Sequence, residues 1–202
     1  MVKYNLLLLM IAAFLGCNQN KTKTVNTKPD TAAPKPLAVN QQLIAGKRAG
    51  NIKLNEDIDS AINILGKPDR GDAAMGAQSA TWFNNKDSNS YQTQVYAHRN
   101  MGAKDENISR IKLVRITSPW YQTPEHLQIG SSLTEISKYY KVTAKSDYTE
   151  KDAHIKVYND ARKGIGFEID SVSQKCVGII ISAPGDSLIA NISLHNNSRK
   201  LK

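Results

Sequence analysis

Side chains that could perform catalysis or bind a metal are widely separated in this sequence of 202 residues. A metal site needs His, Cys or carboxylate ligands at short spacing, and a nucleophile needs a neighbouring base, as in the G-x-S-x-G turn. Neither pattern occurs, and there is no glycine-rich loop of the phosphate-binding kind. The four histidines are scattered along the chain: His98, His126, His154 and His195. We therefore expect no enzymatic activity, no catalytic residue, no metal and no cofactor.

The most informative reactive side chain is Cys17, which ends the apolar stretch LLLLMIAAFLGC at residues 6–17. The apolar run from Leu6 to Gly16 has 11 residues, whereas a membrane-spanning helix needs about 20. Lys3 precedes the run and the small residue Gly16 ends it, which is the layout of a bacterial export signal. Residues 1–16 are therefore predicted to be a signal peptide. The alternatives are a secretory signal in which Cys17 is incidental, and a retained membrane helix.

The residues Phe14-Leu15-Gly16-Cys17 resemble the lipobox of bacterial lipoproteins. This resemblance implies cleavage before Cys17 and acylation of its thiol, so that membrane lipid becomes a partner of the chain. Stable anchoring needs at least two acyl chains, which a lipidated Cys17 would supply. Asn18 replaces the aspartate that marks inner-membrane retention in some bacteria. The predicted location is the cell envelope, at the periplasmic face of the outer membrane.

The second cysteine, Cys176, lies in the apolar segment KCVGIII. Once Cys17 is acylated, Cys176 has no partner for a disulfide within the chain. The predicted role of Cys176 is a small buried hydrophobic side chain, and pairing with another chain is the alternative.

The net charge of +9 is concentrated at the ends of the chain. Between residues 41 and 195 there are 19 basic and 17 acidic side chains, so the central part is close to neutral. Residues 17–46 are rich in Asn, Thr, Lys, Ala and Pro and are predicted to be a lipid-anchored, disordered linker. Residues 190–202 are predicted to be a basic tail. We expect these ends to lie against anionic head groups or to be solvated, and we expect no nucleic-acid partner.

Two segments that lie 75 residues apart share one apolar pattern. When IKLNEDIDSAINILG, residues 52–66, is placed over LQIGSSLTEISKYYK, residues 127–141, the apolar positions coincide. A similar order of strand-like segments follows each of them. The sequence therefore predicts two tandem repeats, at residues 47–124 and 125–189.

Each repeat is predicted to begin with a short helix. Apolar residues at i, i+3, i+4 and i+7 from Ile58 to Leu65 predict an amphipathic helix that Gly66 ends. Ser132 and Glu135 have capping-box spacing at the start of the second helix. The predicted strands are residues 80–83, 91–98 and 108–117, then 154–158, 164–170 and 176–182. The predicted fold class is α+β, with two tandem repeats that each pack a short helical segment on a small antiparallel β-meander.

The order of these segments resembles two known families. The Ile-x-Leu pattern that begins at Ile52, followed by the LGKP phrase that begins at Leu65 and by three strands, resembles the small envelope lipoproteins of the SmpA/OmlA type. The doubling of the unit resembles the β-lactamase inhibitor proteins, in which two tandem copies of helices lie on an antiparallel sheet. The similarity covers about residues 50–184. It implies the same α+β fold and, by analogy with the inhibitors, inhibition of an envelope or secreted hydrolase.

Alternation along the strands predicts which side chains face away from the helices. Ile155 and Val157 are predicted on the helix-facing side. The side chains predicted to face away, and to bind a partner, are Phe83, Tyr96, His98, Tyr158 and Glu168. Aromatic residues on an open sheet face suit protein contacts because they bring a large area at low entropic cost. The alternatives are that one sheet covers the other, or that the linker or tail packs across this face.

The connection PWYQTPEH, which begins at Pro119, contains two adjacent aromatic residues, Trp120 and Tyr121. They are predicted to join the two repeats, and a contact with a partner is the alternative. The leading hypothesis from the sequence is a lipid-anchored envelope protein that acts as a non-catalytic protein-binding or assembly module. An inhibitor of an envelope or secreted hydrolase is one alternative, and a small-molecule or lipid-binding protein is the other.

Overall fold

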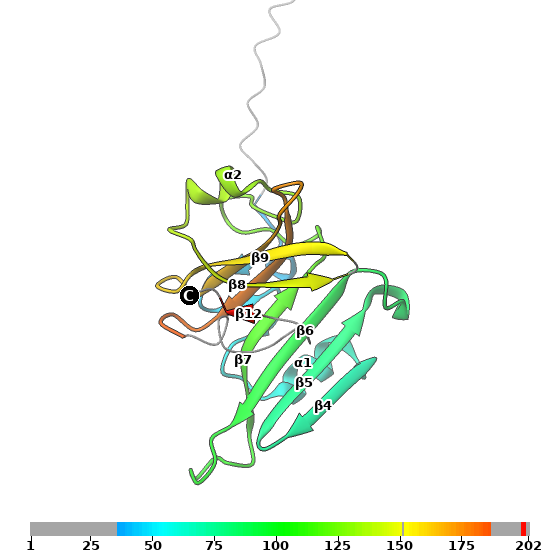
Figure 1. Ribbon diagram of the computed structural model, residues 1–202. Coiled ribbons are helices and arrows are strands. Elements are labelled where there is room, and N and C mark those ends of the chain that lie inside the picture. Colours follow the sequence, from blue (N-terminus) through cyan, green and yellow to red (C-terminus); the bar gives the residue numbers. More distant parts are fainter. Residues whose placement is uncertain (1–35, 151, 187–198, 201–202) are drawn as a thin grey trace, which may run out of the picture. The chain divides into compact units, whose positions relative to one another are not determined.

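The computed structural model describes residues 36–150, 152–186 and 199–200 (Figure 1). The described residues from Pro36 onward form one compact unit. The predicted signal peptide and Cys17 lie outside the described residues. No helix in the described ranges is both long enough and apolar enough to cross a bilayer.

Two antiparallel sheets make up most of the regular secondary structure of the described residues. The small sheet has the order β1-β2-β3, with β1 (Leu43–Ile44), β2 (Arg48–Ala49) and β3 (Ile52–Lys53). The large sheet has nine strands in the order β12-β8-β9-β10-β11-β7-β6-β5-β4. Its strands are β4 (Arg70–Ala74), β5 (Ala77–Phe83), β6 (Gln92–Arg99), β7 (Ser109–Ile116), β8 (Thr143–Glu150), β9 (Ala153–Asp160), β10 (Ile165–Asp170), β11 (Cys176–Ser182) and β12 (Arg199–Lys200).

The helices in the described residues are short. The α-helices are α1 (Ile58–Leu65) and α2 (Leu133–Ser137), and the 3-10 turns are η1 (Val39–Gln41) and η2 (Asn84–Lys86). Helix α1 begins at Asp57, whose carboxylate accepts a hydrogen bond from the backbone N–H of Asp59, and it ends at Gly66 in a positive-φ conformation that suits glycine. Helix α2 begins with the predicted capping box between Ser132 and Glu135. Both predicted helix starts are confirmed.

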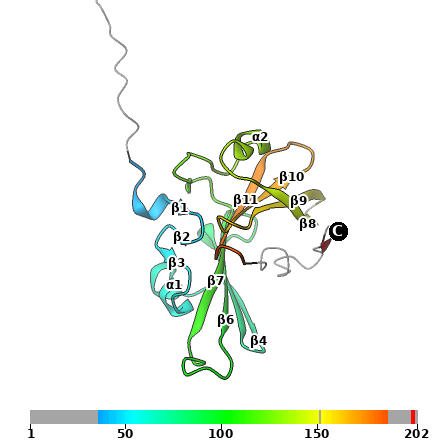
Figure 2. The same cartoon turned by 90° about the vertical axis from the view of Figure 1, so that its left-hand side faces the viewer.

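The main core lies on one face of the large sheet. There the sheet packs against α1, α2 and the small sheet, and Figure 2 shows α1 and the small sheet on the same side of β6 and β7. The core contains Leu43 from β1, Ile58 from α1, Ile136 from α2 and Phe167 from β10. Strand β10 contributes every second residue to it, namely Ile165, Phe167 and Ile169, as the alternation of side chains along a strand predicts.

A second, smaller cluster lies on the opposite face of the large sheet. It contains Leu113 of β7, Tyr148 of β8, Ile180 of β11, and Ile155 and Val157 of β9. Strands β7 and β8 are separated by three strands in the sheet order, yet their side chains meet in this cluster. The sheet is therefore strongly curled, with β8 and β9 folded toward β7, as Figure 1 shows.

The predicted fold class, two tandem helix-on-meander repeats, is wrong. The chain is mostly β, and β7 pairs with β11 through Ile116 and Ile179, so the two sets of strands form one continuous sheet. Helix α2 has only five residues, so it cannot cover a meander of its own. The main core contains residues from both predicted repeats. The two strands that join the repeats, β7 and β11, are both apolar and lie in the middle of the large sheet.

The small sheet was not predicted either. Its first strand, β1, lies within residues 17–46, the predicted linker. Residues 36–46 belong to the compact unit, and Leu43 is fully buried there. The backbone N–H of Leu43 donates to the carbonyl of Gln122 at 2.7 Å, which fixes this segment beside the connection that follows β7. A single buried leucine in a polar stretch gives too little periodicity to reveal such a strand from sequence.

The six predicted strands correspond to β5, β6, β7, β9, β10 and β11, with ends that differ by up to three residues. Strands β4 and β8 were not predicted, since RGDAA and TAKSDYTE lack the apolar alternation of a half-buried strand. Of the predicted basic tail, residues 199–200 form β12 beside β8, and the rest lies outside the described residues.

Candidate ligand-binding site

A buried arginine lies at the centre of the second face of the sheet. Arg115 belongs to β7, whose last four residues are all buried, and its side chain is only 2% exposed. A charged group in such a position is costly unless it is paired and hydrogen-bonded. The contacts of Arg115 therefore define this part of the molecule.

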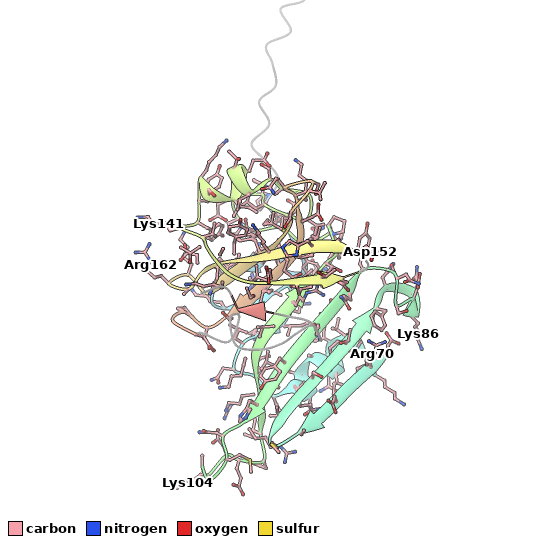
Figure 3. The ribbon with its side chains drawn as sticks, viewed as in Figure 1. Arg70, Lys86, Lys104, Lys141, Asp152 and Arg162 are labelled. Atoms are coloured by element: carbon pink, nitrogen blue, oxygen red, sulfur yellow. The ribbon has the colours of Figure 1, made fainter. Side chains whose placement is uncertain are left out.

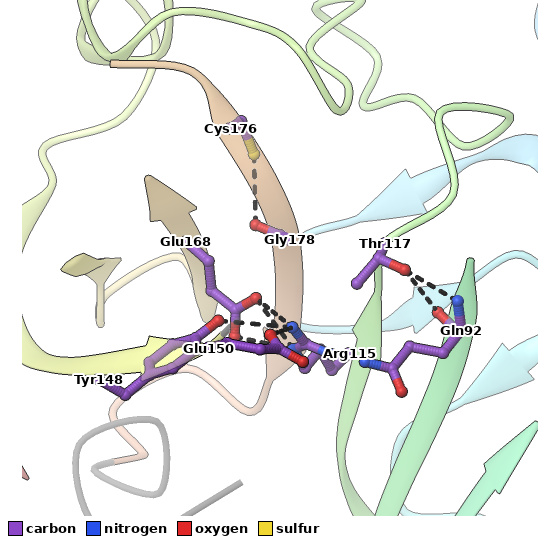
Figure 4. Close-up of polar contacts among 8 residues, drawn as sticks. All are labelled: Gln92, Arg115, Thr117, Tyr148, Glu150, Glu168, Cys176 and Gly178. Carbon is purple, nitrogen blue, oxygen red and sulfur yellow. Dashed lines mark hydrogen bonds and ion pairs between the residues drawn. The ribbon is translucent and has the colours of Figure 1, made fainter. Parts of the chain in front are cut away.

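Glu168 of β10 is the main partner of Arg115 (Figure 4). The Nε atom of Arg115 donates to both carboxylate oxygens, at 2.8 and 2.9 Å, and Nη2 lies 2.8 Å from Oε2. Burial, the largest single effect, would lower the pKa of Arg115, but the charge of Glu168 and its hydrogen bonds, with smaller effects of Tyr148 and Glu150, together hold the pKa above its ordinary value. Arg115 is thus charged at any physiological pH.

Gly178 of β11 makes room for this carboxylate. Gly178 lies directly beside Glu168 in the sheet, and a Cβ atom at that position would collide with Glu168 Oε2. Glycine therefore lets two neighbouring strands carry a buried ion pair without pushing the carboxylate away from Arg115.

Two residues of β8, Tyr148 and Glu150, are further polar neighbours of Arg115 that lie near its Nη2 atom. The hydroxyl of Tyr148 lies 3.5 Å from Arg115 Nη2, and Glu150 Oε2 lies 3.9 Å from the same atom. Burial, followed by the charge of Glu168, raises the pKa of Tyr148 well above its ordinary value, so the phenol stays protonated. The Glu150 side chain is 46% exposed and connects the buried pair with the surface.

One edge of the Arg115 guanidinium has no partner in the described part of the chain. A guanidinium has five N–H donors, and the bonds to Glu168 use the edge formed by Nε and Nη2. Nη1 lies on the other side of this planar group, and this buried atom makes no hydrogen bond to any described residue. An unsatisfied buried donor costs about 1–3 kcal/mol, so an acceptor at this point would be stabilising.

A pocket of about 300 Å³ lies beside Arg115. Four parts of the chain line it: the connection between β5 and β6 at residues 88–90, the adjoining ends of β6 and β7, the adjoining ends of β8 and β9, and the adjoining ends of β10 and β11. The adjoining ends supply Gln92 and Thr117, which also hydrogen-bond each other. Figure 3 shows Lys86 and Asp152, which flank this region, on the same side of the molecule, whereas Lys104 lies at the far end of β6 and β7.

The pocket has polar, charged and apolar walls. Arg115, Glu150 and Asp170 supply charge, and Ile155 and Val177 supply an apolar surface. The pKa of Asp170 is lowered, chiefly by the backbone N–H of Ser173, so this carboxylate is ionised at neutral pH. Such a mixture of convergent polar groups and apolar wall is typical of a binding site.

The structure brings only some of the predicted partner-binding residues together. Tyr96 packs against the second cluster, and His98 follows it along β6. Phe83, on β5, contacts the guanidinium of Arg70, whose central carbon lies 5.6 Å from the ring centre. Glu168 is fully buried, so it is available to Arg115 and not to a partner at the surface.

Tyr158 lies on the other face of the sheet, away from the rest of the predicted set. It is paired with Phe167 across β9 and β10 and packs against the main core. Ile155 and Val157, predicted to face the helices, lie in the second cluster instead. The assignment of faces along β9 was therefore reversed, because β9 carries buried residues on both sides and its alternation alone does not say which side meets the helices.

Arg115, Tyr148 and Glu150 are not among the predicted site residues. The available signal was a charged residue inside the apolar segment KLVRIT, because such a residue is either exposed or paired. Its partner Glu168 is 53 positions away, and spacing alone does not reveal a pairing of that range.

The prediction for Cys176 is confirmed. This cysteine is 1% exposed, and its thiol donates to the carbonyl oxygen of Gly178 at 3.2 Å. Burial raises the pKa of the Cys176 thiol, which makes it a poor nucleophile at neutral pH.

Comparisons with known proteins found a distant structural similarity. No protein-family model matches the chain, and no curated protein matches it. Among solved structures, the chain is similar to an extracellular protein containing an SCP domain from Bacillus anthracis str. Ames, with a TM-score of 0.43 and 11% sequence identity. The match covers 68% of this chain and 46% of that one, so the chain spans less than half the length of that protein.

Proposed function

We propose that this protein is a lipid-anchored protein of the cell envelope that acts as a non-catalytic binding module, and that it binds another envelope protein through the pocket beside Arg115. The anchor would be Cys17 in the segment FLGC, and Asn18 favours the periplasmic face of the outer membrane. Arg115, Glu150 and the walls of the pocket would hold a segment of the partner.

The observation that carries the binding function is the unpartnered Nη1 atom of Arg115. Placing a guanidinium in the centre of a sheet is costly, and its pairing with Glu168 leaves two donors unused beside a pocket. A bound oxygen acceptor would complete the hydrogen bonding of Arg115, which is a reason for such a group to be buried there.

A blocking substitution tests this function. Ser88 is exposed at the rim of the pocket, so Ser88→Trp should fill its entrance without disturbing the core. In cells treated with a crosslinker, the full-length wild-type protein should capture a defined envelope protein, and Ser88→Trp should reduce that capture about tenfold. Lys104→Trp, at the far end of β6 and β7, is the matched control and should capture normally. Equal capture by Ser88→Trp would contradict a role for the pocket.

Metabolic labelling with radioactive palmitate tests the anchor. The wild-type chain should be labelled and should sediment with membranes, whereas Cys17→Ala should lose the label because the acylated thiol is absent. The buried Cys176 should take up no label in either chain. Equal labelling of the Cys17→Ala chain would exclude lipidation at this position.

The pocket also favours a second candidate, the binding of a free small molecule. Its volume of about 300 Å³ is at the small end of the range for ligand sites. A purified full-length protein that binds a small polar compound, without capturing any protein in cells, would favour this candidate.

A further inference from the structure

The pocket beside Arg115 carries an excess of negative charge among the described residues. Glu150 and Asp170 line it, and Glu168 lies beneath it in contact with Arg115. Three carboxylates therefore belong to the pocket or lie beneath it, and two of them, Glu168 and Glu150, are paired with Arg115. Arg115 is the one basic side chain among the described residues that line the pocket.

This charge pattern sets two requirements for a ligand. The two lining carboxylates attract a cation, because Glu168 already neutralises Arg115. The Nη1 atom of Arg115 needs an oxygen acceptor, because its two N–H groups have no partner in the described residues. A suitable ligand thus carries a positive group and an acceptor oxygen a short distance apart.

We propose that the pocket binds the free amino terminus of a polypeptide, an inference that rests on the protein-binding function proposed above. The α-ammonium group interacts with Glu150 and Asp170, and the first carbonyl oxygen accepts a hydrogen bond from Arg115 Nη1. The first side chain lies against the apolar wall formed by Ile155 and Val177. The small volume of the pocket limits it to the end of a chain.

Other simple ligands meet only part of these requirements. A carboxylate or a phosphate would satisfy Arg115 but would be repelled by the three acidic side chains. A lysine side chain would supply the cation, but its ammonium group is four methylenes away from the nearest backbone oxygen. A free amino acid has both groups, but it adds a negative charge that the amide carbonyl of a peptide does not have.

Titration of the purified full-length protein with short peptides tests this proposal. The probes are Ala-Ala-Ala-amide, its N-acetylated form, and free alanine, each followed by calorimetry in detergent at neutral pH. The unblocked peptide should bind, and acetylation should weaken binding at least tenfold because it removes a charge-assisted interaction. Free alanine should bind more weakly than the unblocked peptide.

Substitutions then locate the binding. Glu150→Gln removes a partly exposed carboxylate and should weaken peptide binding about tenfold, while the folded state is kept. Glu106→Gln is the matched control, because Glu106 is exposed in the connection between β6 and β7, away from the pocket. Arg115→Lys should also weaken binding, and its circular dichroism spectrum shows whether the fold is kept.

The possible outcomes separate this proposal from the function on which it rests. Equal binding of the acetylated peptide, or of free alanine, would overturn the assignment to an amino terminus. So would the absence of binding by any unblocked peptide, even if Ser88→Trp still abolished partner capture, and in that case the proposed function would stand. Partner capture that is insensitive to Ser88→Trp would instead contradict the proposed function.

Discussion

The buried ion pair of Arg115 and Glu168 determines which substitutions on the second face of the sheet leave the protein stable. Removal of one partner leaves the other charge buried without compensation, which typically costs about 3–5 kcal/mol. Each of Arg115→Ala and Glu168→Ala should therefore strongly reduce the free energy of unfolding, measured by urea denaturation at pH 7. The double substitution Arg115→Met with Glu168→Leu should cost much less than the sum of the two single changes, because no buried charge remains. Additive losses would show that the two charges are not coupled.

Gly178 provides a test of the same pair from the neighbouring strand. A methyl group at this position collides with the Glu168 carboxylate, so Gly178→Ala should destabilise the protein by several kcal/mol. The same substitution in a Glu168→Ala chain should have an effect of about 1 kcal/mol or less, because the colliding group is gone and alanine otherwise suits a strand better than glycine. Urea denaturation of both pairs of chains measures this difference. A large loss in both backgrounds would mean that Gly178 is needed for another reason.

A second hydrogen-bonded pair makes stability depend on pH. The Tyr140 hydroxyl donates to Glu125 Oε2 at 2.8 Å. Partial burial would raise the pKa of Glu125, but the hydrogen bonds from Tyr140 and Thr123 outweigh it and lower the pKa. A lowered pKa in the folded state adds stability above the ordinary pKa of 4.5 and loses it as the pH falls through the folded value.

Tyr140→Phe should therefore reduce the free energy of unfolding by about 1 kcal/mol at pH 7, an estimate that allows for the partial exposure of Glu125. The difference from wild type should shrink as the pH falls from 4.5 through the lowered pKa of Glu125 in the folded state, where the carboxylate becomes protonated. Thermal unfolding between pH 3 and pH 7 measures it. Tyr139→Phe, at the neighbouring exposed position, should show no such pH dependence.

At the scale of single elements, helix α2 depends on Ser132, the residue that caps its start. A helix of five residues cannot be stable through its own hydrogen bonds, so its cap and its contact through Ile136 must hold it. Ser132→Ala removes one side of the capping box and should cost about 1 kcal/mol. Hydrogen exchange should show faster exchange at the backbone N–H groups of Ile136 and Tyr140. Ser137→Ala, at an exposed position on the same helix, is the control and should leave exchange unchanged.

The elements could be predicted from sequence more reliably than their arrangement. The stripe from Ile58 to Leu65 and the capping box at Ser132 identify both α-helices, because these signals are local. Polar strands were missed, as for β8, since only Ala144 and Tyr148 of its eight residues are apolar. The missed strand β8 also explains the error at Tyr158. Because β8 lies beside β9 and covers part of the second face, β9 has apolar side chains on both faces, and its alternation does not show which face meets the helices.

The candidate site depends on contacts that no local pattern contains. The sequence indicates a strand around Arg115 and another around Glu168, and it places Glu168 on the correct face, opposite Phe167. It does not indicate that β8 folds back over this face and buries the pair beneath Tyr148. Glu168 was therefore expected at an open surface, whereas the curling of the sheet encloses it.

At the scale of the whole molecule, the pairing of β7 with β11 joins the two parts of the chain. Ile116 and Val114 of β7 lie beside Ile179 and Ile181 of β11, and all four are fully buried in the main core. Neither strand could serve as an edge, because an exposed edge of such apolar residues would favour aggregation. The two predicted repeats are therefore not separate units, since their strands share the large sheet and the main core.

This arrangement predicts that the two parts of the chain do not fold alone. Residues 36–124 without the rest expose the outer edge of β7, and residues 125–202 expose that of β11, so each part should lack a cooperative thermal transition. The complete chain should unfold in one transition, because its main core spans both parts. Mixing the two fragments should restore the circular dichroism of a β-sheet, since the β7–β11 ladder can form between chains. Calorimetry of the fragments decides the matter: a cooperative transition in residues 125–202 alone would mean that this part has a sufficient core of its own.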